Sequence, residues 1–118
     1  MTDEIPVSLF FDLLNARNLN RLGGLLTEGV QFYFPKTQPL VGKQQIIRFF
    51  KILFRQYPEL AFEIQGTIIQ GAMAAVHWKN RGFNRRGEPY QNEGVTLLTM
   101  EGDKITFISD FFKDTGKF

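Results

Sequence analysis

Hydrophobic residues recur at helical spacing in three stretches of the chain. Apolar side chains at positions 7, 10, 11 and 14 share one stripe, which predicts an amphipathic helix over residues 6–17. A second, shorter helix is predicted over residues 19–27, where Asn18 can act as the N-cap. The longest helix is predicted over residues 43–57, because a wide apolar stripe runs through it and Pro58 ends it.

The remaining segments have strand patterns. Residues 30–34 alternate between two faces and stop at Pro35, which predicts a strand between the second and third helices. Four more strands are predicted after the third helix, over residues 60–70, 73–83, 90–100 and 105–112. Short polar turns join them, as in an antiparallel meander. This order predicts a single α+β domain over residues 1–118, in which a curved, mostly antiparallel sheet wraps round three helices.

Composition narrows the functional classes. The chain has 118 residues, no cysteine and one histidine, so we expect no disulfide, no metal site and no cofactor. Its net charge is only +2, and the basic cluster at residues 79–86 has no recognition motif, so nucleic-acid binding is not expected. An acidic start and no apolar run of roughly 20 residues predict a soluble, cytoplasmic protein without a membrane segment. The 13 phenylalanines indicate an apolar pocket, a subunit interface or both.

The last two predicted strands carry the main candidate residue. A polar connection at residues 101–104 joins them, which is typical of a hairpin. Asp110 is the only charged residue of the second strand, where an unpaired charge would be costly to bury. Alternation predicts one face with Thr106, Ile108, Asp110 and Phe112, and an opposite face with Ile105, Phe107 and Phe111. Because both faces are apolar, we expect one to pack on the core and the other on a partner subunit.

Several short motifs accompany these elements. They are Phe-Phe-Asp-Leu-Leu-Asn at 10–15, Phe-Tyr-Phe-Pro at 32–35, Val-His-Trp at 76–78, Asn-Glu-Gly-Val at 92–95 and Asp-Phe-Phe-Lys-Asp at 110–114. With them, nearly the whole chain resembles the nuclear transport factor 2-like superfamily in its SnoaL-like branch. The resemblance implies a cone that encloses a cavity for a small apolar molecule, and a convex sheet face that pairs two subunits as a homodimer. It implies no single activity, since the family includes isomerases, cyclases, epoxide hydrolases, dehydratases and transport adaptors.

The resemblance also implies site residues. In the epoxide-hydrolase-like relatives, an Asp at the place of Asp110 faces the cavity and activates water with polar partners on neighbouring strands. Trp and Asn stand here where that chemistry needs basic and acidic partners, so the full hydrolase mechanism is not expected. The predicted catalytic residues are Asp110 and Tyr33. The predicted substrate-binding residues are Gln31, Phe50, Trp78, Asn80, Asn92, Ile108 and Phe112.

Each main candidate also has a simpler structural interpretation. A cavity walled by Phe and Ile would raise the pKa of Asp110 towards that of a general base, whereas a surface Asp110 would pair with Lys113 or Arg81. Tyr33 would donate a hydrogen bond to a developing oxyanion, or would be a wall residue with its hydroxyl on water. Asn92 would orient a ligand carbonyl, or would bond to backbone at the end of a strand.

Three functions stay open from the sequence. The first is a SnoaL-like lyase, isomerase or hydrolase that acts on a small, largely apolar molecule with Asp110 as base. The second is a non-catalytic binding module for an apolar metabolite, and the third is a dimeric interaction protein with a vestigial pocket. The single histidine, His77, alternates with Trp78 and therefore points outward if Trp78 faces the cavity.

Overall fold

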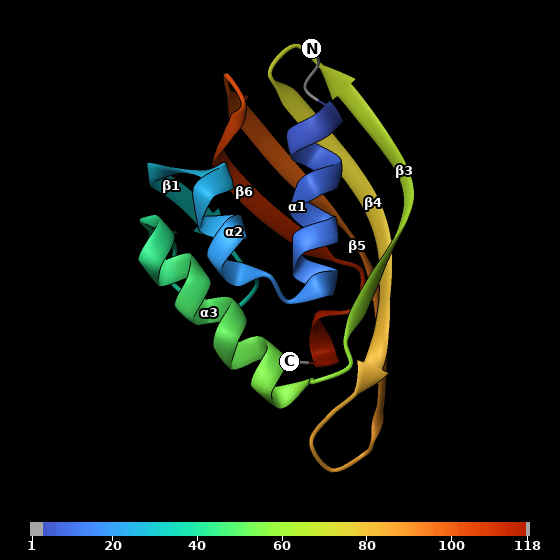
Figure 1. The fold of residues 1–118 in the computed structure, drawn as a ribbon. Helices are drawn as coiled ribbons and strands as arrows, with labels where there is room; N and C mark the ends of the chain where they lie inside the picture. The colour runs from blue at the N-terminus through green and yellow to red at the C-terminus, as the bar shows by residue number, and fades with distance from the viewer. Residues whose placement is uncertain (1–3, 118) are drawn as a thin grey trace.

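The chain forms one curved sheet with helices on its inner, concave face (Figure 1). The computed structural model describes residues 4–117. These residues contain the helices α1 (Glu4–Ala16), α2 (Leu19–Leu25) and α3 (Lys43–Gln56), and the short 3-10 helix η1 (Thr115–Lys117). The strands are β1 (Leu26–Tyr33), β2 (Leu40–Val41), β3 (Ala61–Gln70), β4 (Met73–Phe83), β5 (Pro89–Glu101) and β6 (Lys104–Phe112). The predicted α+β fold is confirmed, and β2 lies in a segment for which no strand was predicted.

The strand order β2-β1-β6-β5-β4-β3 brings the first strand beside the last one. Strands β3 to β6 form the predicted antiparallel meander, whereas β1 pairs with β6 in parallel. Leu26, the first residue of β1, already pairs with Ile105, so the chain passes from α2 into the sheet without a loop. The second helix therefore ends at Leu25, earlier than predicted.

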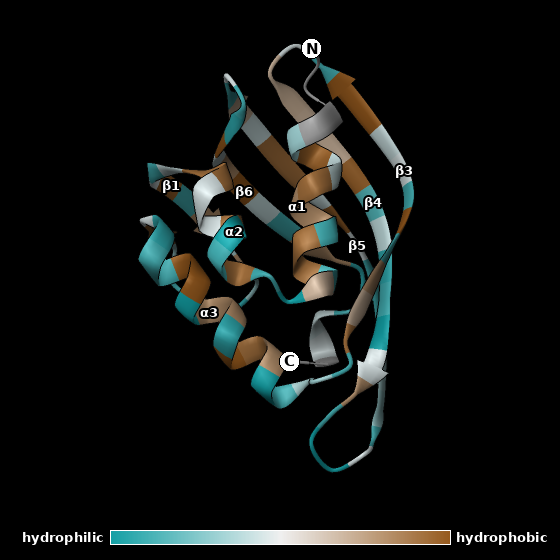
Figure 2. Cartoon of the chain, in the orientation of Figure 1, coloured by the Kyte–Doolittle hydropathy of each residue, from teal (hydrophilic) through white to brown (hydrophobic). Residues whose placement is uncertain are grey.

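The hydrophobic core lies between the helices and the inner face of the sheet. Figure 2 shows that α1 is hydrophobic over most of its length, whereas α3 alternates between hydrophobic and hydrophilic residues. Phe10, Phe11 and Leu14 of α1 are buried, and so are Ile46 and Phe50 of α3. This burial is typical of amphipathic helices that cover a sheet. None of the helices within residues 4–117 is long and apolar enough to cross a membrane.

A β-bulge changes the faces predicted for β6. Thr99 pairs with Phe107 and Met100 pairs with Ile105, so Thr106 is an extra residue between two regular stretches. On either side of the bulge, Ile105 and Ile108 are both fully buried in the core. The prediction that placed Ile105 on the face opposite Ile108 was therefore wrong, because simple alternation does not hold across an inserted residue.

Two side chains fix the end of α1 to the start of β3. The Asn15 side chain donates to the backbone oxygen of Phe62 at 2.9 Å and accepts from its backbone nitrogen at 2.8 Å, as a neighbouring strand would. Arg17 donates to the carbonyl oxygen of Leu60 at 2.6 Å, and its guanidinium lies 3.8 Å from the ring centre of Phe54. These contacts hold one end of the space between α3 and the sheet.

Candidate functional site

A cavity of about 300 Å³ lies between α3 and the inner face of the sheet. Its walls are mainly aromatic, with Phe49 and Phe50 from α3 opposite Phe112 from β6. Two of its polar side chains come from the middle of the sheet, Asn80 on β4 and Asp110 on β6. The size and the apolar lining suit a small organic molecule.

Asp110 ends a chain of three hydrogen-bonded side chains. Thr96, its direct cross-strand neighbour on β5, donates its hydroxyl proton to Asp110 Oδ1 at 2.6 Å. Trp78 Nε1 on β4 donates to the oxygen of Thr96 at 2.8 Å. Because the indole nitrogen can only donate, Thr96 accepts from Trp78 and gives its own proton to Asp110. The chain therefore fixes one carboxyl oxygen of Asp110.

The surroundings of Asp110 change its acidity. Burial raises the pKa of Asp110 from 3.8 to about 7, and the hydrogen bond from Thr96 opposes part of that rise. The side chain lines the cavity and also reaches a surface hollow beside the ends of β1 and β6. Near neutral pH both the protonated and the ionised form are populated. Asp110 can therefore give or take a proton in the cavity without a large energetic cost.

Other predicted binding residues have different positions relative to the cavity. Phe50, Asn80 and Phe112 line it. Trp78 and Ile108 are fully buried behind the wall, where Trp78 packs against Phe112 with the ring centres 4.9 Å apart. The structure therefore brings together Asp110 with three of its predicted neighbours, and gives Trp78 a role through Thr96 that was not predicted.

The Asn92 side chain hydrogen-bonds to the backbone near the C-terminal end of the chain. Its Nδ2 donates to the backbone oxygen of Asp114 at 2.9 Å, and its Oδ1 accepts from the backbone nitrogen of Asp114 at 3.3 Å. Its Nδ2 also lies 3.2 Å from the hydroxyl of Tyr90. Of the two interpretations given for Asn92, these contacts agree with the second, an amide at the end of a strand that hydrogen-bonds to backbone. Asn92 is not among the residues that line the cavity.

Tyr33 and Gln31 lie on the outer face of the sheet. β1 pairs with β6 so that Phe32 is level with Ile108 and both are buried, which turns Tyr33 and Gln31 to the opposite side. Tyr33 is 39% exposed, and its ring packs 5.5 Å from that of Phe107. The structure does not bring these two residues into the cavity, because the more apolar face of β1 takes the core.

Sequence reasoning missed Thr96, Tyr57 and Tyr90. Tyr57 at the end of α3 and Tyr90 on β5 line the cavity with their ring centres 5.0 Å apart. Tyr57 is the last residue of the predicted third helix, and alternation puts Tyr90 and Thr96 on the same strand face as Asn92. Only the strand register, which the sequence leaves open, selects Thr96 as the partner of Asp110.

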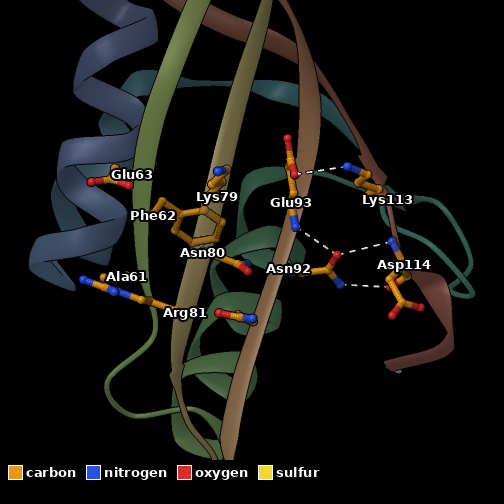
Figure 3. A pocket seen from close by; sticks show the side chains of 11 residues that line it. Ala61, Phe62, Glu63, Lys79, Asn80, Arg81, Asn92, Glu93, Lys113 and Asp114 are labelled. Atoms are coloured by element: carbon orange, nitrogen blue, oxygen red, sulfur yellow. Dashed lines mark hydrogen bonds and ion pairs between the residues drawn. The ribbon is translucent and has the colours of Figure 1, made fainter.

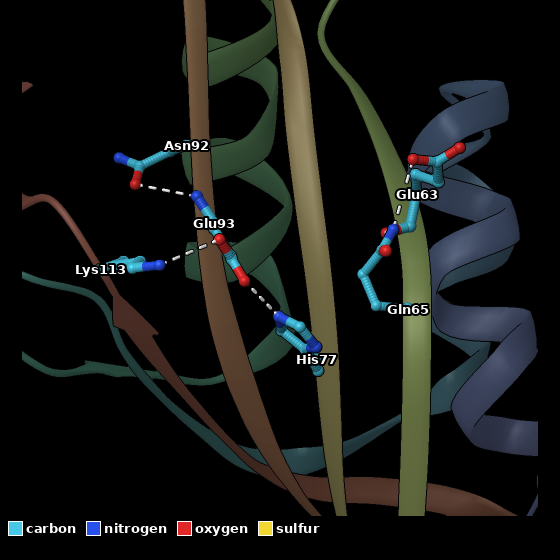
Figure 4. A network of polar contacts seen from close by, with 6 residues as sticks. All are labelled: Glu63, Gln65, His77, Asn92, Glu93 and Lys113. Carbon is cyan, nitrogen blue, oxygen red and sulfur yellow. Dashed lines mark hydrogen bonds and ion pairs between the residues drawn. The ribbon is translucent and has the colours of Figure 1, made fainter.

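A shallow hollow on the outer face of the sheet carries charged residues of both signs (Figure 3). Glu93 lies between two basic groups: its carboxylate is 2.6 Å from His77 Nε2 and 3.4 Å from Lys113 Nζ (Figure 4). The hydrogen bond with His77, followed by the charge of Lys113, lowers the pKa of Glu93. Within the described part of the chain, no group of three or more metal-ligating side chains could hold a metal ion.

A family model for the SnoaL-like domain matches residues 7–108. Comparison with curated protein sequences gives no match. Among solved structures, a nuclear transport factor 2-like protein of unknown function from Burkholderia pseudomallei aligns with a TM-score of 0.89 at 18% identity, over 99% of this chain and 95% of that one. TerC, co-crystallised with polyporic acid, aligns with a TM-score of 0.87 at 17% identity, over 98% and 93% of the two chains.

A third similar structure also holds a small molecule. It is a protein with a ketosteroid isomerase-like fold from Catenulispora acidiphila, in complex with trimethylamine. It aligns with a TM-score of 0.83 at 18% identity, over 90% of this chain and 83% of that one. At such identities the likeness concerns the fold alone.

Proposed function

The chain belongs to the SnoaL-like domain family, and on that premise we propose that it binds a small, largely apolar molecule and transfers a proton with Asp110. One observation carries the proposal. Asp110 lines an aromatic cavity, has a pKa of about 7, and accepts a hydrogen bond from Thr96 on one oxygen. Structures of similar fold hold small ligands, polyporic acid in TerC and trimethylamine in the Catenulispora protein, which supports binding of a small molecule.

Proton transfer next to a carbonyl group is the reaction that suits this arrangement best. The ionised Asp110 takes a proton from the carbon beside the carbonyl, and the electron pair moves to the carbonyl oxygen as an enolate forms. Protonated Asp110 then returns the proton to the same or a neighbouring carbon, as a lyase or isomerase requires. Hydrolysis is less favoured, because the acidic and basic partners of the epoxide-hydrolase-like relatives are Trp78 and Asn80 here.

Hydrogen exchange in ketones tests this proposal. In deuterium oxide, small apolar ketones such as cyclohexanone and tetralone should lose the NMR signal of the hydrogens beside the carbonyl faster with the protein than without it. The rate should rise with pH through about 7, because only ionised Asp110 can take the proton. Asp110→Asn should lower it on the order of a hundredfold. Asp12→Asn, at an exposed position of α1, should not change it.

A non-catalytic binding module is the second candidate. The mainly apolar, aromatic-rich lining of the cavity favours it, because such a lining provides affinity without chemistry. Ketones that perturb the NMR signals of the cavity residues but show no Asp110-dependent exchange would support this alternative. Ketones that do not bind at all would contradict both functions.

A homodimer through the outer face of the sheet completes the proposal. This face presents apolar side chains from adjacent strands, including Phe111, which is 55% exposed, beside Val95 and Leu97. The occupant is a second copy of the chain, since the resemblance to this superfamily implies pairing of the convex faces. Apolar side chains that gather on one exposed face of a sheet are typical of protein interfaces.

Light scattering tests the dimer. Wild-type protein should have the mass of two chains at micromolar concentration, and Phe111→Glu combined with Leu97→Glu should have the mass of one. Charges on this face would have to be buried unpaired in the interface. Ile52→Glu, at an exposed apolar position on α3, should stay dimeric. A wild-type monomer at these concentrations would contradict the proposal.

A further inference from the structure

Asn80 carries a buried amide oxygen that has no hydrogen-bond partner within the described residues. The residue is 4% exposed. A buried polar atom without a partner costs free energy, so such atoms are rare in folded proteins. Asn80 lines the same cavity as Asp110. Its acceptor is therefore available to a molecule that enters the cavity.

The neighbours of Asn80 in the sheet cannot supply the missing hydrogen bond. On one side β4 pairs Asn80 with Asn92, whose amide is engaged by Tyr90 and by the backbone of Asp114. On the other side it pairs Asn80 with Phe62, whose ring offers no donor. Asn80 therefore lies between one amide that is already engaged and one aromatic side chain. A hydrogen-bond donor on a ligand in the cavity would supply the missing partner of Asn80 Oδ1.

The cavity also limits the charge of that donor. An anionic group would face the acceptor oxygen of Asn80 and the carboxyl group of Asp110 in the same apolar space. A cationic group would lose its hydration on entry, and Asp110 is ionised in only part of the molecules near neutral pH, so its charge compensates that loss incompletely. A neutral hydroxyl group provides one donor at the lowest cost of desolvation. The rest of the ligand is apolar, in keeping with the walls.

We infer that Asn80 is the specificity-determining residue of this cavity and selects molecules that carry a neutral hydroxyl group on an apolar body, such as phenols and cyclic alcohols. This inference rests on the proposed function, because it requires that the cavity binds small molecules. Combined with proton transfer by Asp110, it specifies the substrate class. The substrate is a hydroxylated ketone whose hydroxyl donates to Asn80 Oδ1 while a carbon–hydrogen bond beside its carbonyl faces Asp110.

Matched probes separate the hydroxyl from the rest of the ligand. We would measure the dissociation constants of para-tert-butylphenol, its methyl ether para-tert-butylanisole and the cationic para-tert-butylbenzylamine by calorimetry. The ether keeps the oxygen and the apolar body but has no proton to donate. Wild-type protein should bind the phenol about tenfold more tightly than the ether, as expected for one buried hydrogen bond. It should bind the amine more weakly than the phenol.

Two variants assign the preference to Asn80. Asn80→Leu should bind the phenol and the ether equally, and should melt at a higher temperature, because it removes an unsatisfied buried group. Gln45→Leu is the control, since Gln45 is an exposed amide on α3 that does not line the cavity, and its loss should leave the tenfold preference intact. The higher melting temperature would also establish that Asn80→Leu is folded.

The outcomes distinguish this inference from the proposed function. If the phenol and the ether bind wild-type protein equally, or if the preference survives in Asn80→Leu, the inference is wrong while ligand binding by the cavity stands. If the amine binds most tightly, the head group is a cation and the inference is wrong as well. If none of the three probes binds, the proposed function fails, and this inference fails with it.

Discussion

Replacing Asp110 by asparagine is expected to make the protein more stable at pH 8 by about 2–3 kcal/mol. The pKa of Asp110 is about 7 in the folded protein against 3.8 as its ordinary value. Between these values the unfolded chain releases the proton while the folded chain keeps it, so the free energy of unfolding falls as the pH rises. The full difference corresponds to roughly 4 kcal/mol, lost between about pH 4 and pH 7.

Asparagine has nearly the same shape and still accepts the hydrogen bond from Thr96, but it cannot ionise. Its new amide hydrogens must be accommodated, which is why the expected gain is smaller than the full difference. Urea denaturation at pH 5 and pH 8 measures the effect. The difference between variant and wild type should grow between these pH values. Taking this difference removes other contributions, such as that of Glu93, whose lowered pKa acts in the opposite direction.

Asp12→Asn is the control for the loss of a carboxylate, because Asp12 is exposed on α1. This variant should keep the pH dependence of the wild type. A variant at Asp110 that is less stable than wild type at pH 8, or that keeps the full slope, would contradict the burial of this carboxyl group in an apolar cavity. The proposed role as a base would then lose its physical ground.

Gly94→Ala is expected to destabilise the protein by about 2–3 kcal/mol. A Cβ atom at this position of β5 would overlap the carbonyl oxygen of Phe111 and would lie 2.8 Å from the ring of Trp78. The carbonyl oxygen belongs to a paired strand, and Trp78 is fully buried, so neither can move freely. Displacement of the indole would also weaken its hydrogen bond to Thr96. Urea denaturation followed by far-ultraviolet circular dichroism measures the loss.

Gly29→Ala is the matched control in another strand. No atom lies within 4 Å of a Cβ atom added at Gly29, so this change should be neutral or stabilising by up to about 1 kcal/mol. Equal stability of the two alanine variants would mean that β5 can shift away from Trp78. The close approach of strand and indole would then not determine the shape of the cavity wall.

The fold follows from sequence pattern much further than the site does. Helical stripes and alternation predict the three helices, the strand before the third helix and the final meander. The parallel pairing of β1 with β6 is not readable from local pattern, because it depends on which exposed strand edge the chain meets when it folds back. The cone shape that these elements form was predicted from the resemblance to the superfamily.

One inserted residue limits how far the site can be predicted. A regular hairpin continued from the pair of Glu101 and Lys104 would put Thr96 opposite Ser109, so Thr96 could not be assigned to Asp110. The bulge at Thr106 shifts the register and makes Thr96 the partner of Asp110. Nothing in the residue types around Thr106 marks that insertion.

The position of Tyr33 could not be predicted, because both faces of the strand β1 carry aromatic residues. Gln31 and Tyr33 alternate with Phe32 and Phe34, so the strand pattern separates the two faces without stating which one is inside. The core takes the face with the larger apolar area, and Tyr33 is left outside. The pocket position of Asp110, by contrast, agrees with its alternation with Ile108 and Phe112, because all three residues lie after the bulge at Thr106.

The chain of hydrogen bonds from Trp78 through Thr96 to Asp110 connects the cavity to a fluorescent side chain. Trp78 is the only tryptophan, so all indole fluorescence comes from one position, two hydrogen bonds away from the carboxyl group. Ionisation of Asp110 or entry of a molecule beside it alters the electric field at the indole. Unlabelled protein can therefore serve as its own optical sensor in a search through compound libraries, before any reaction is known.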